Sequence, residues 1–310
     1  EDIMITLTHG NYIKRLPVDT FRSQKRGGRG VTGMGTKEED FVEHLFVTTT
    51  HHNILFFTSR GRVYRLKGYE IPEAGRTAKG TSIVNLLPLE EKERITAVIP
   101  IKEFSGKRSL FMATKKGIVK KTELLEFDTA RKSGLIAITL DEDDDLLGVK
   151  LTNGEHHVLL GTRDGLAICF PESDVRVMGR TAHGVRGISL HTSDEVVGMD
   201  TVKKDGEVLT VTAEGYGKRT PISEYRNQKR GGKGVINTKV TEKTGEVVGI
   251  KVVRPGQELM LISSEGIVIR IDIDGISVIS RNTQGVTLMR TSEADKVVAL
   301  ATVEKKTDND

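Results

Sequence analysis

Two short segments of the 310-residue chain bring positive charge and glycine together at close spacing. The first is Gln24-Lys25-Arg26-Gly27-Gly28-Arg29-Gly30, and the second is Gln228-Lys229-Arg230-Gly231-Gly232-Lys233-Gly234. Lys and Arg supply charge and hydrogen-bond donors suited to phosphate, and glycine lets backbone N–H groups come close to a ligand. A solvated basic turn would account for one such segment. Two copies at the same place of an internal repeat favour phosphate binding.

The charge of the chain is segregated rather than large. Its net charge is only +4, yet the segments 22–29 and 226–233 are basic and contain no acid. Acids gather elsewhere, at 38–40, 90–91 and 141–145. This pattern indicates a stripe that binds a polyanion. The absence of Trp and the low aromatic content, 5%, argue against a platform on which single-stranded bases stack.

The composition also bounds the compartment. The chain has no apolar run long enough to span a bilayer, and Glu1-Asp2 stands where a signal peptide would need basic and apolar residues. A single cysteine, Cys169, excludes a disulfide framework and is typical of a reducing cytoplasm. We therefore expect a cytoplasmic protein without a membrane partner.

Several patterns that would carry other chemistry are incomplete. Gly28–Gly33 has the spacing of a dinucleotide-binding turn but no helix to follow it. The acidic run 141–145 lacks the glycine that a calcium loop needs at its sixth position, where Leu146 stands. The adjacent pairs His51-His52 and His156-His157 would point to opposite faces of a strand. We predict no catalytic residue, no metal site and no cofactor.

The elements that must position the two basic segments are strands. Six times a β-alternating run ends in a short polar turn with a glycine and is followed by another run, which predicts a hairpin. These hairpin glycines are Gly10, Gly61, Gly117, Gly165, Gly215 and Gly266. A second glycine follows each at nearly fixed distance: Gly30, Gly80, Gly134, Gly184, Gly234 and Gly285. A short strand and then a longer apolar strand complete each unit.

Six units of four strands predict an all-β fold, a six-bladed propeller-like disc formed by residues 1–303 as a single domain. The chain opens directly on a hairpin strand, Ile3 to Leu7, and ends on a fourth-type strand, Val297 to Val303. We predict that these two strands pair and close the ring. The charged tail 304–310 is expected to be disordered.

Cations recur at two positions of the repeat. Four residues before the second glycine stand Arg26, Arg76, Ala130, Arg180, Arg230 and Arg281. Four residues after the hairpin glycine stand Lys14, Arg65, Lys121, Cys169, Arg219 and Arg270. Beside the same turns lie Lys79, Arg131 and Lys132. One interpretation is a ring of cations along one edge of the disc, weaker at units three and four. The other is an arginine that pairs with an acid of the neighbouring blade, and both can hold.

The segment Gln24 to Gly30 resembles the gyrase box, Q-[RK]-R-G-G-[RK]-G, of the C-terminal domain of the DNA gyrase A subunit. The resemblance covers the whole chain, with six units and their hairpin glycines. It implies a six-bladed β-pinwheel that wraps duplex DNA around a basic rim. The wrapped segment is presented for strand passage, so that the enzyme introduces negative supercoils.

The resemblance also implies what lies outside this chain. The tyrosine that cleaves DNA belongs to the domain that precedes this one in the family, so the chain alone is expected not to be an enzyme. ATP and Mg²⁺ belong to other parts of an ATP-dependent type II topoisomerase. The implied partners are duplex DNA and, in an A2B2 heterotetramer, the rest of gyrase A together with gyrase B. The implied location is the bacterial cytoplasm, at the nucleoid.

Two alternatives remain open at this point. The C-terminal domain of topoisomerase IV is similar, but its box is typically degraded, and two intact boxes favour gyrase. A generic propeller scaffold for protein partners would need exposed aromatic or apolar anchors, which the sequence hardly supplies. No base-reading pattern is evident, so we expect little sequence preference.

Overall fold

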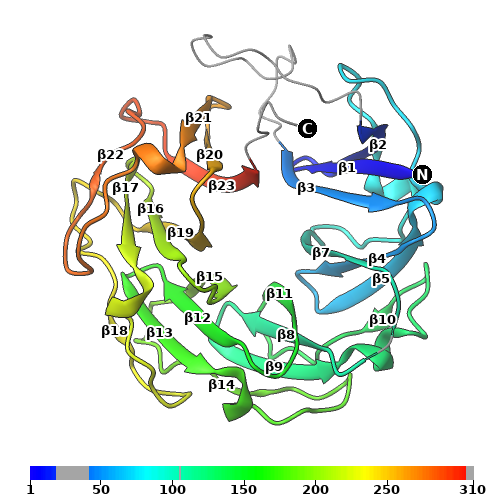
Figure 1. Ribbon diagram of the computed structural model, residues 1–310, viewed down its shortest axis with the longest axis horizontal. Coiled ribbons are helices and arrows are strands. Elements are labelled where there is room, and N and C mark those ends of the chain that lie inside the picture. The colour runs from blue at the N-terminus through cyan, green and yellow to red at the C-terminus, as the bar shows by residue number, and fades with distance from the viewer. Residues whose placement is uncertain (19–41, 105, 305–310) are drawn as a thin grey trace.

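The computed structural model describes residues 1–18, 42–104 and 106–304, which form six sheets around a central axis (Figure 1). No α-helix occurs in these residues. Each unit of the chain contributes one antiparallel hairpin. The hairpins are β1 (Asp2–Thr8) with β2 (Tyr12–Pro17), β4 (Asn53–Thr58) with β5 (Arg62–Lys67), β8 (Ser109–Thr114) with β9 (Ile118–Glu123), β12 (His157–Thr162) with β13 (Leu166–Pro171), β16 (Glu207–Thr212) with β17 (Tyr216–Pro221), and β20 (Gln257–Ser263) with β21 (Val268–Asp272).

A longer strand lines the central axis in every blade (Figure 1). These inner strands are β3 (Val42–Thr49), β7 (Ile95–Ile101), β11 (Leu146–Thr152), β15 (Val196–Thr201), β19 (Val247–Val253) and β23 (Val297–Glu304). Short 3-10 helices connect the sheet strands: η2 (Gly68–Glu70), η3 (Ile83–Asn85), η4 (Leu124–Phe127), η5 (Glu172–Asp174), η6 (Ile222–Glu224) and η7 (Ile273–Gly275).

The outermost strand of a blade comes from a later unit of the chain. These two-residue strands are β6 (Thr81–Ser82), β10 (Leu135–Ile136), β14 (Val185–Arg186), β18 (Val235–Ile236) and β22 (Val286–Thr287). The first sheet, for example, has the order β3-β1-β2-β6. Five blades have four described strands, and the sixth has three, in the order β21-β20-β23. The predicted all-β, six-bladed propeller is confirmed. Because each unit adds a strand to the blade before it, neighbouring blades are tied by main-chain hydrogen bonds.

The predicted ring closure is wrong. The last strand, β23, pairs with β20 of its own unit, with Leu261 opposite Leu300, and β1 pairs with β3, with Ile5 opposite Phe46. The inner strand therefore belongs to the hairpin that precedes it in the chain, not to the one that follows. The first blade gains its inner strand from β3 and needs nothing from the end of the chain. Of the predicted tail 304–310, Glu304 ends β23 and the rest lies outside the described residues.

The hairpin turns share one hydrogen-bond pattern. The first hairpin strand ends in Thr or Ser, whose hydroxyl accepts an N–H from the start of the second strand, as Thr162 does from Leu166 at 3.0 Å. The residue just before that N–H has a positive φ, which glycine adopts at little cost. In the first unit this residue is Asn11, with φ of 67°, and not Gly10. The prediction that Gly10 makes this turn is wrong by one residue.

The apolar core lies between the faces of adjacent blades. Phe57 of β4 meets Phe127 of η4 edge to face, with ring centroids 5.9 Å apart. Leu55 and Leu110, from the hairpins of the second and third blades, belong to the same buried cluster. Five such clusters join consecutive blades from the first to the sixth, so the blades pack on one another through apolar faces.

Candidate nucleic-acid interface

The first basic segment, Gln24, Lys25, Arg26, Gly27, Gly28, Arg29 and Gly30, lies outside the described residues. The second can be followed in full. We call the residues that lead to the second glycine of a unit its rim loop; the described rim loops are 75–80, 129–134, 179–184, 228–234 and 280–285. Each rim loop leads to an outer strand, at the periphery of the disc (Figure 1).

The rim loop 228–234 is anchored on the unit before it. Gln228 donates its N–H to the carbonyl of Cys169 at 2.8 Å, and Gly231 donates to the carbonyl of Gly187 at 2.8 Å. The N–H of Ser189 donates to the carbonyl of Gly232 at 2.9 Å, and its hydroxyl donates to that of Gly231 at 2.7 Å. The loop carbonyls are thus turned toward the fourth unit.

The opposite side of this loop offers cations and donors to solvent. Lys229 and Lys233 are exposed. Gly231 has φ of +87° and Gly234 of +80°, a conformation that most side chains avoid. The N–H groups of Gly232 and Lys233 have no hydrogen-bond partner among the described residues. Two ammonium groups beside free backbone N–H groups can hold a phosphate.

The arginine four residues before the second glycine has a structural contact in three of the described rim loops. Its Nη1 donates to a carbonyl of the preceding outer strand: Arg180 to Ile136 at 2.7 Å, Arg230 to Arg186 at 2.8 Å and Arg281 to Ile236 at 2.7 Å. The main-chain N–H groups of the same residues donate to carboxylates of Glu126, Asp174 and Glu224. These arginines therefore clamp neighbouring units. The acid of the neighbouring blade contacts the main chain rather than the guanidinium.

The cations four residues after the hairpin glycine are mostly turned into the structure. Lys121 is buried, with Nζ 3.1 Å from the carbonyl of Glu172 and 3.7 Å from its carboxylate. Arg219 is buried, and its Nε donates to the carbonyl of Ile276 at 2.8 Å. The prediction that these two, with Lys14, line the surface is wrong, because this strand position faces the next unit.

The remaining two members of that set differ. Arg65 is partly buried, donates from Nη1 to the carbonyl of Asp128 at 2.8 Å and lies over the ring of Phe104. Arg270 is exposed and pairs with Glu258 at 3.2 Å. Arg270 is the one member of this set, among the residues that the structure describes, whose side chain is mainly solvent-exposed.

Two buried lysines, Lys120 and Lys218, were not found from the sequence, and Lys14 acts as they do. The ammonium group of each of the three lies under the rim loop of the next unit and donates hydrogen bonds to its carbonyls. Lys14 Nζ donates to the carbonyls of Gly75, Arg76 and Ala78 at 3.1, 3.0 and 2.8 Å. Lys120 donates to the carbonyl of Arg180, and Lys218 to those of Ser280, Arg281 and Thr283. Burial lowers the pKa of Lys120 and of Lys218 to about 8.

These lysines were missed because the first hairpin was aligned with the others one residue out of register. Counting from Gly10 aligns Lys14 with Lys121, whereas counting from Asn11 aligns Lys14 with Lys120 and Lys218. Asn tolerates the left-handed conformation better than most residues, so an Asn after Gly10 was the available signal.

Several other cations do lie open at the rim. Arg76, Arg131 and Lys132 are exposed, the last with its ammonium 4.0 Å from Glu70. Lys79 is exposed and lies over the ring of Tyr12, 4.1 Å from its centroid. Arg186 and Arg226, next to the second box, are exposed as well and were not predicted as site residues. Arg186 has no counterpart in the other units, whereas Arg226 recurs as Arg22 and Arg176, a signal that could have found it.

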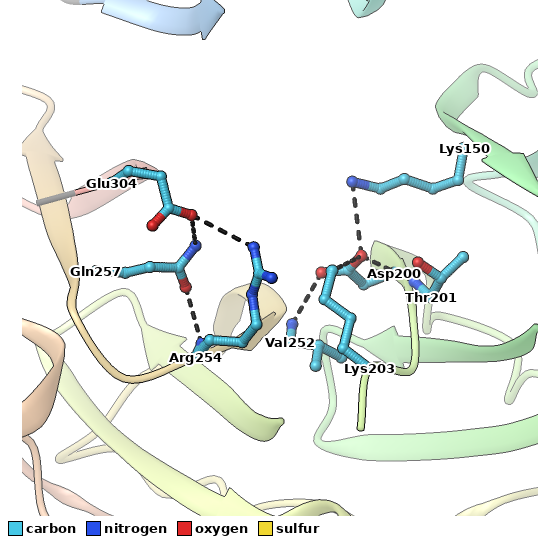
Figure 2. Close-up of polar contacts among 8 residues, drawn as sticks. All are labelled: Lys150, Asp200, Thr201, Lys203, Val252, Arg254, Gln257 and Glu304. Atoms are coloured by element: carbon cyan, nitrogen blue, oxygen red, sulfur yellow. Dashed lines mark hydrogen bonds and ion pairs between the residues drawn. The ribbon is translucent and has the colours of Figure 1, made fainter. Parts of the chain in front are cut away.

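Charges on the inner strands serve a different purpose. Figure 2 shows Asp200 of β15 between two blades: its carboxylate accepts the N–H of Val252 at 2.9 Å and lies 3.6 Å from Lys150. Burial alone would raise the pKa of Asp200, but Lys150, Lys203 and two N–H donors hold it below its usual value. These charges tie blades together near the axis and are not offered to a ligand at the rim.

Two features of the described residues concern metal binding and thiol chemistry. These residues contain no group of three or more His, Cys, Asp or Glu side chains suited to a metal ion. Cys169 is buried, and burial raises its pKa to about 11, so it is no thiolate nucleophile. No helix in the described ranges is long and apolar enough to cross a membrane.

The fold and the rim loops together define a six-bladed propeller-like domain with a basic rim. A family model described as DNA gyrase C-terminal domain, beta-propeller, matches six consecutive segments: residues 2–49, 52–102, 108–153, 156–203, 206–254 and 257–304. The chain belongs to this family. The six matched segments coincide with the six units, each with its hairpin and inner strand.

Similar proteins support the same assignment. The chain is 55% identical over 305 residues to the DNA gyrase A subunit of Clostridium acetobutylicum, covering 98% of this chain and 37% of that protein. It is 48% identical to the DNA gyrase A subunit of Staphylococcus epidermidis, covering 100% of this chain and 35% of that protein. The chain therefore spans little more than a third of the curated relatives that it matches.

Solved structures do not separate gyrase from topoisomerase IV. The C-terminal domain of DNA topoisomerase IV matches with a TM-score of 0.84, over 98% of this chain and 94% of that one. The DNA gyrase A C-terminal domain matches with 0.79, over 97% and 99%. Both are 26% identical. Shape is shared by the two classes, so the family model and the gyrase A relatives carry the distinction.

Proposed function

We propose that this chain binds, bends and wraps duplex DNA around its basic rim, and so presents a segment for strand passage. The observation that carries the proposal is the second box. Its loop is open, Lys229 and Lys233 are exposed, and the N–H of Gly232 is free of partners among the described residues. The first box, Lys25, Arg26 and Arg29 above all, is proposed to act in the same way.

The proposed setting is a complete bacterial DNA gyrase in the cytoplasm. This chain would act as its non-catalytic wrapping domain, with the cleaving tyrosine, ATP and Mg²⁺ located in other parts of an A2B2 assembly. Wrapping in one direction would let the assembly introduce negative supercoils. The curated relatives carry the name of the DNA gyrase A subunit, which supports this setting.

The energetics favour several anchors rather than one. Bending 20–30 base pairs smoothly by 40–90° costs on the order of 1–6 kcal/mol. Exposed cations at several rim loops, such as Arg76, Lys132 and Lys229, would each offset part of this cost. Because these cations would contact phosphates rather than base edges, the preference for sequence should follow DNA deformability.

An energy-transfer measurement on duplexes labelled at both ends tests the proposal. The chain should bring the ends together, and log K should fall with log salt by about 0.9 per neutralised phosphate. Replacing Lys25, Arg26 and Arg29 by Ala should leave binding measurable but separate the ends. A duplex that stays straight at low salt with the intact chain would refute wrapping.

A further inference from the structure

The rim loops fall into two kinds according to what lies beneath them. Under 75–80, 179–184 and 280–285 lies a buried lysine of the preceding blade, Lys14, Lys120 or Lys218. In each case the ammonium binds the carbonyl of the arginine four residues before the second glycine, Arg76, Arg180 or Arg281. A buried ammonium needs such acceptors because it is otherwise poorly solvated. The buried ammonium therefore holds these loop carbonyls toward the interior of the protein.

Loops above a lysine are also closed on themselves. The N–H two residues before the second glycine donates to a carbonyl of the same loop in all three. The contacts are Ala78 to Gly75 at 3.1 Å, Ala182 to Gly179 at 3.1 Å and Thr283 to Arg281 at 2.9 Å. In these three loops the N–H two residues before the second glycine is therefore not available to a ligand.

The second box differs at both points. At the place of the lysine stands Ile168 of β13, which is buried, and a Cβ added to Gly232 would lie 3.6 Å from its Cδ1. The N–H of Gly232, which corresponds to those of Ala78, Ala182 and Thr283, has no partner among the described residues. An isoleucine cannot donate a hydrogen bond, so the carbonyl of Arg230 receives no ammonium from beneath. The contacts of Ser189 to the carbonyls of Gly231 and Gly232 do not distinguish the two kinds of loop, because Thr139 makes the same contacts to Thr181 and Ala182 above Lys120.

The two remaining units carry no lysine at this place. The place of the lysine is the third residue after the turn residue with positive φ. In the sixth unit this residue is Ile269. The first basic segment lies outside the described residues, so the comparison rests on the second box. In the second unit the position is Tyr64, and the loop after it, 129–134, belongs to a unit whose two glycines are closer together and which has no box. Among the described rim loops, the three closed ones thus lie above a lysine, and the second box lies above an isoleucine.

We propose that Ile168 is a positioning residue for the second box: an apolar side chain at this place keeps the loop open, where a lysine would draw it closed. The open loop presents the N–H of Gly232 outward between the ammonium groups of Lys229 and Lys233. This inference rests on the proposed function for its consequence in DNA binding. The state of the loop is a property of the free protein and can be measured without DNA.

Amide hydrogen exchange on the ¹⁵N-labelled chain tests the inference. In Ile168→Lys the new ammonium should bind the carbonyl of Arg230, and the exchange of the Gly232 amide should slow about tenfold or more. In Ile168→Met, a side chain of similar length without a donor, the Gly232 amide should exchange as in the parent. Equal exchange rates in the Lys and Met variants would overturn the inference.

A reciprocal variant keeps the question decidable if Ile168→Lys does not fold. Lys218→Met removes the ammonium beneath 280–285, and the Thr283 amide should then exchange about tenfold faster or more. An unchanged Thr283 rate would overturn the inference. In both tests the Ala137 amide, bonded to the carbonyl of Gly61 in the second blade, serves as an internal reference that should not change.

The affinity of the variants for duplex DNA provides a second test. Replacing Lys229 and Lys233 by Ala should weaken binding in the parent and in Ile168→Met, but much less in Ile168→Lys. The same loss in all three backgrounds would overturn the inference. If the parent binds no duplex at low salt, the proposed function fails, while the exchange result still decides the state of the loop.

Discussion

The rim loops 228–234 and 280–285 occupy the same place in consecutive units and share the contacts of their arginine. Arg230 and Arg281 both donate to a carbonyl of the preceding outer strand, at 2.8 and 2.7 Å. They differ beneath the loop, where Ile168 stands in one case and Lys218 in the other. The comparison separates two tasks that the sequence pattern merges. The arginine holds units together, and the residue beneath decides whether the loop has donors left for a ligand.

The largest effect is expected from removing the buried donor. Lys218→Met should lower the free energy of unfolding by roughly 3 kcal/mol, because the hydrogen bonds of the ammonium to the carbonyls of Ser280, Arg281 and Thr283 are lost, at about 1 kcal/mol each. Ile168→Met changes shape but no hydrogen bond and should cost less than about 1.5 kcal/mol. Urea unfolding of the two variants measures this. Equal losses would mean that the lysine contributes no more than its volume.

A pair of glycines in one loop gives the next effect. At Gly234, φ is +80° and an added Cβ would lie 2.4 Å from the carbonyl of Ala167. Gly234→Ala should therefore cost roughly 2 kcal/mol or more. At Gly232 the nearest atom is 3.5 Å away, so Gly232→Ala should stay within about 1 kcal/mol. Thermal unfolding of both variants decides this; a Gly232 variant as unstable as the Gly234 variant would contradict the open loop.

The exposed lysines of the second box are expected to act on binding and not on stability. Replacing Lys229 and Lys233 by Ala should weaken duplex binding roughly tenfold and reduce the salt slope by about 1.8, for two phosphates. Lys204, exposed in the turn between β15 and β16, is the matched control and should change neither quantity when replaced by Ala. Affinity titrations over a range of salt measure both, and an unchanged slope would remove these lysines from the interface.

The smallest effect is a pH dependence that the two loops should not share. Burial lowers the pKa of Lys218 to about 8, with Glu224 and Arg281 as its charged neighbours. Around this value the folded chain begins to release a proton that the unfolded chain keeps up to about 10.5, so stability rises with pH. From pH 7 to 8 the parent should gain roughly 0.4 kcal/mol relative to Lys218→Met, as urea unfolding at the two pH values measures. A falling difference would show that the carbonyls around the ammonium outweigh its burial.

Much of this molecule follows from local patterns. Alternating apolar residues, turn glycines and the fixed distance between two glycines predict six units of strands, and the structure has six sheets. The two basic segments are visible in the sequence because their chemistry lies in consecutive residues. Lys229 and Lys233 are exposed as that pattern predicts. Local spacing suffices wherever the interacting groups are neighbours in the chain.

Tertiary structure alone decided which strand belongs to which blade and which cations face solvent. The inner strand completes the hairpin before it, and Lys14 reaches the carbonyl of Ala78, 64 residues away. Charge and spacing can be read from the sequence. The sequence does not show whether the side of a strand that carries a lysine faces water or packs against the next unit. That choice depends on how units pack around the ring, and the energy of burying an ammonium is recovered only by carbonyls that the fold brings from another unit.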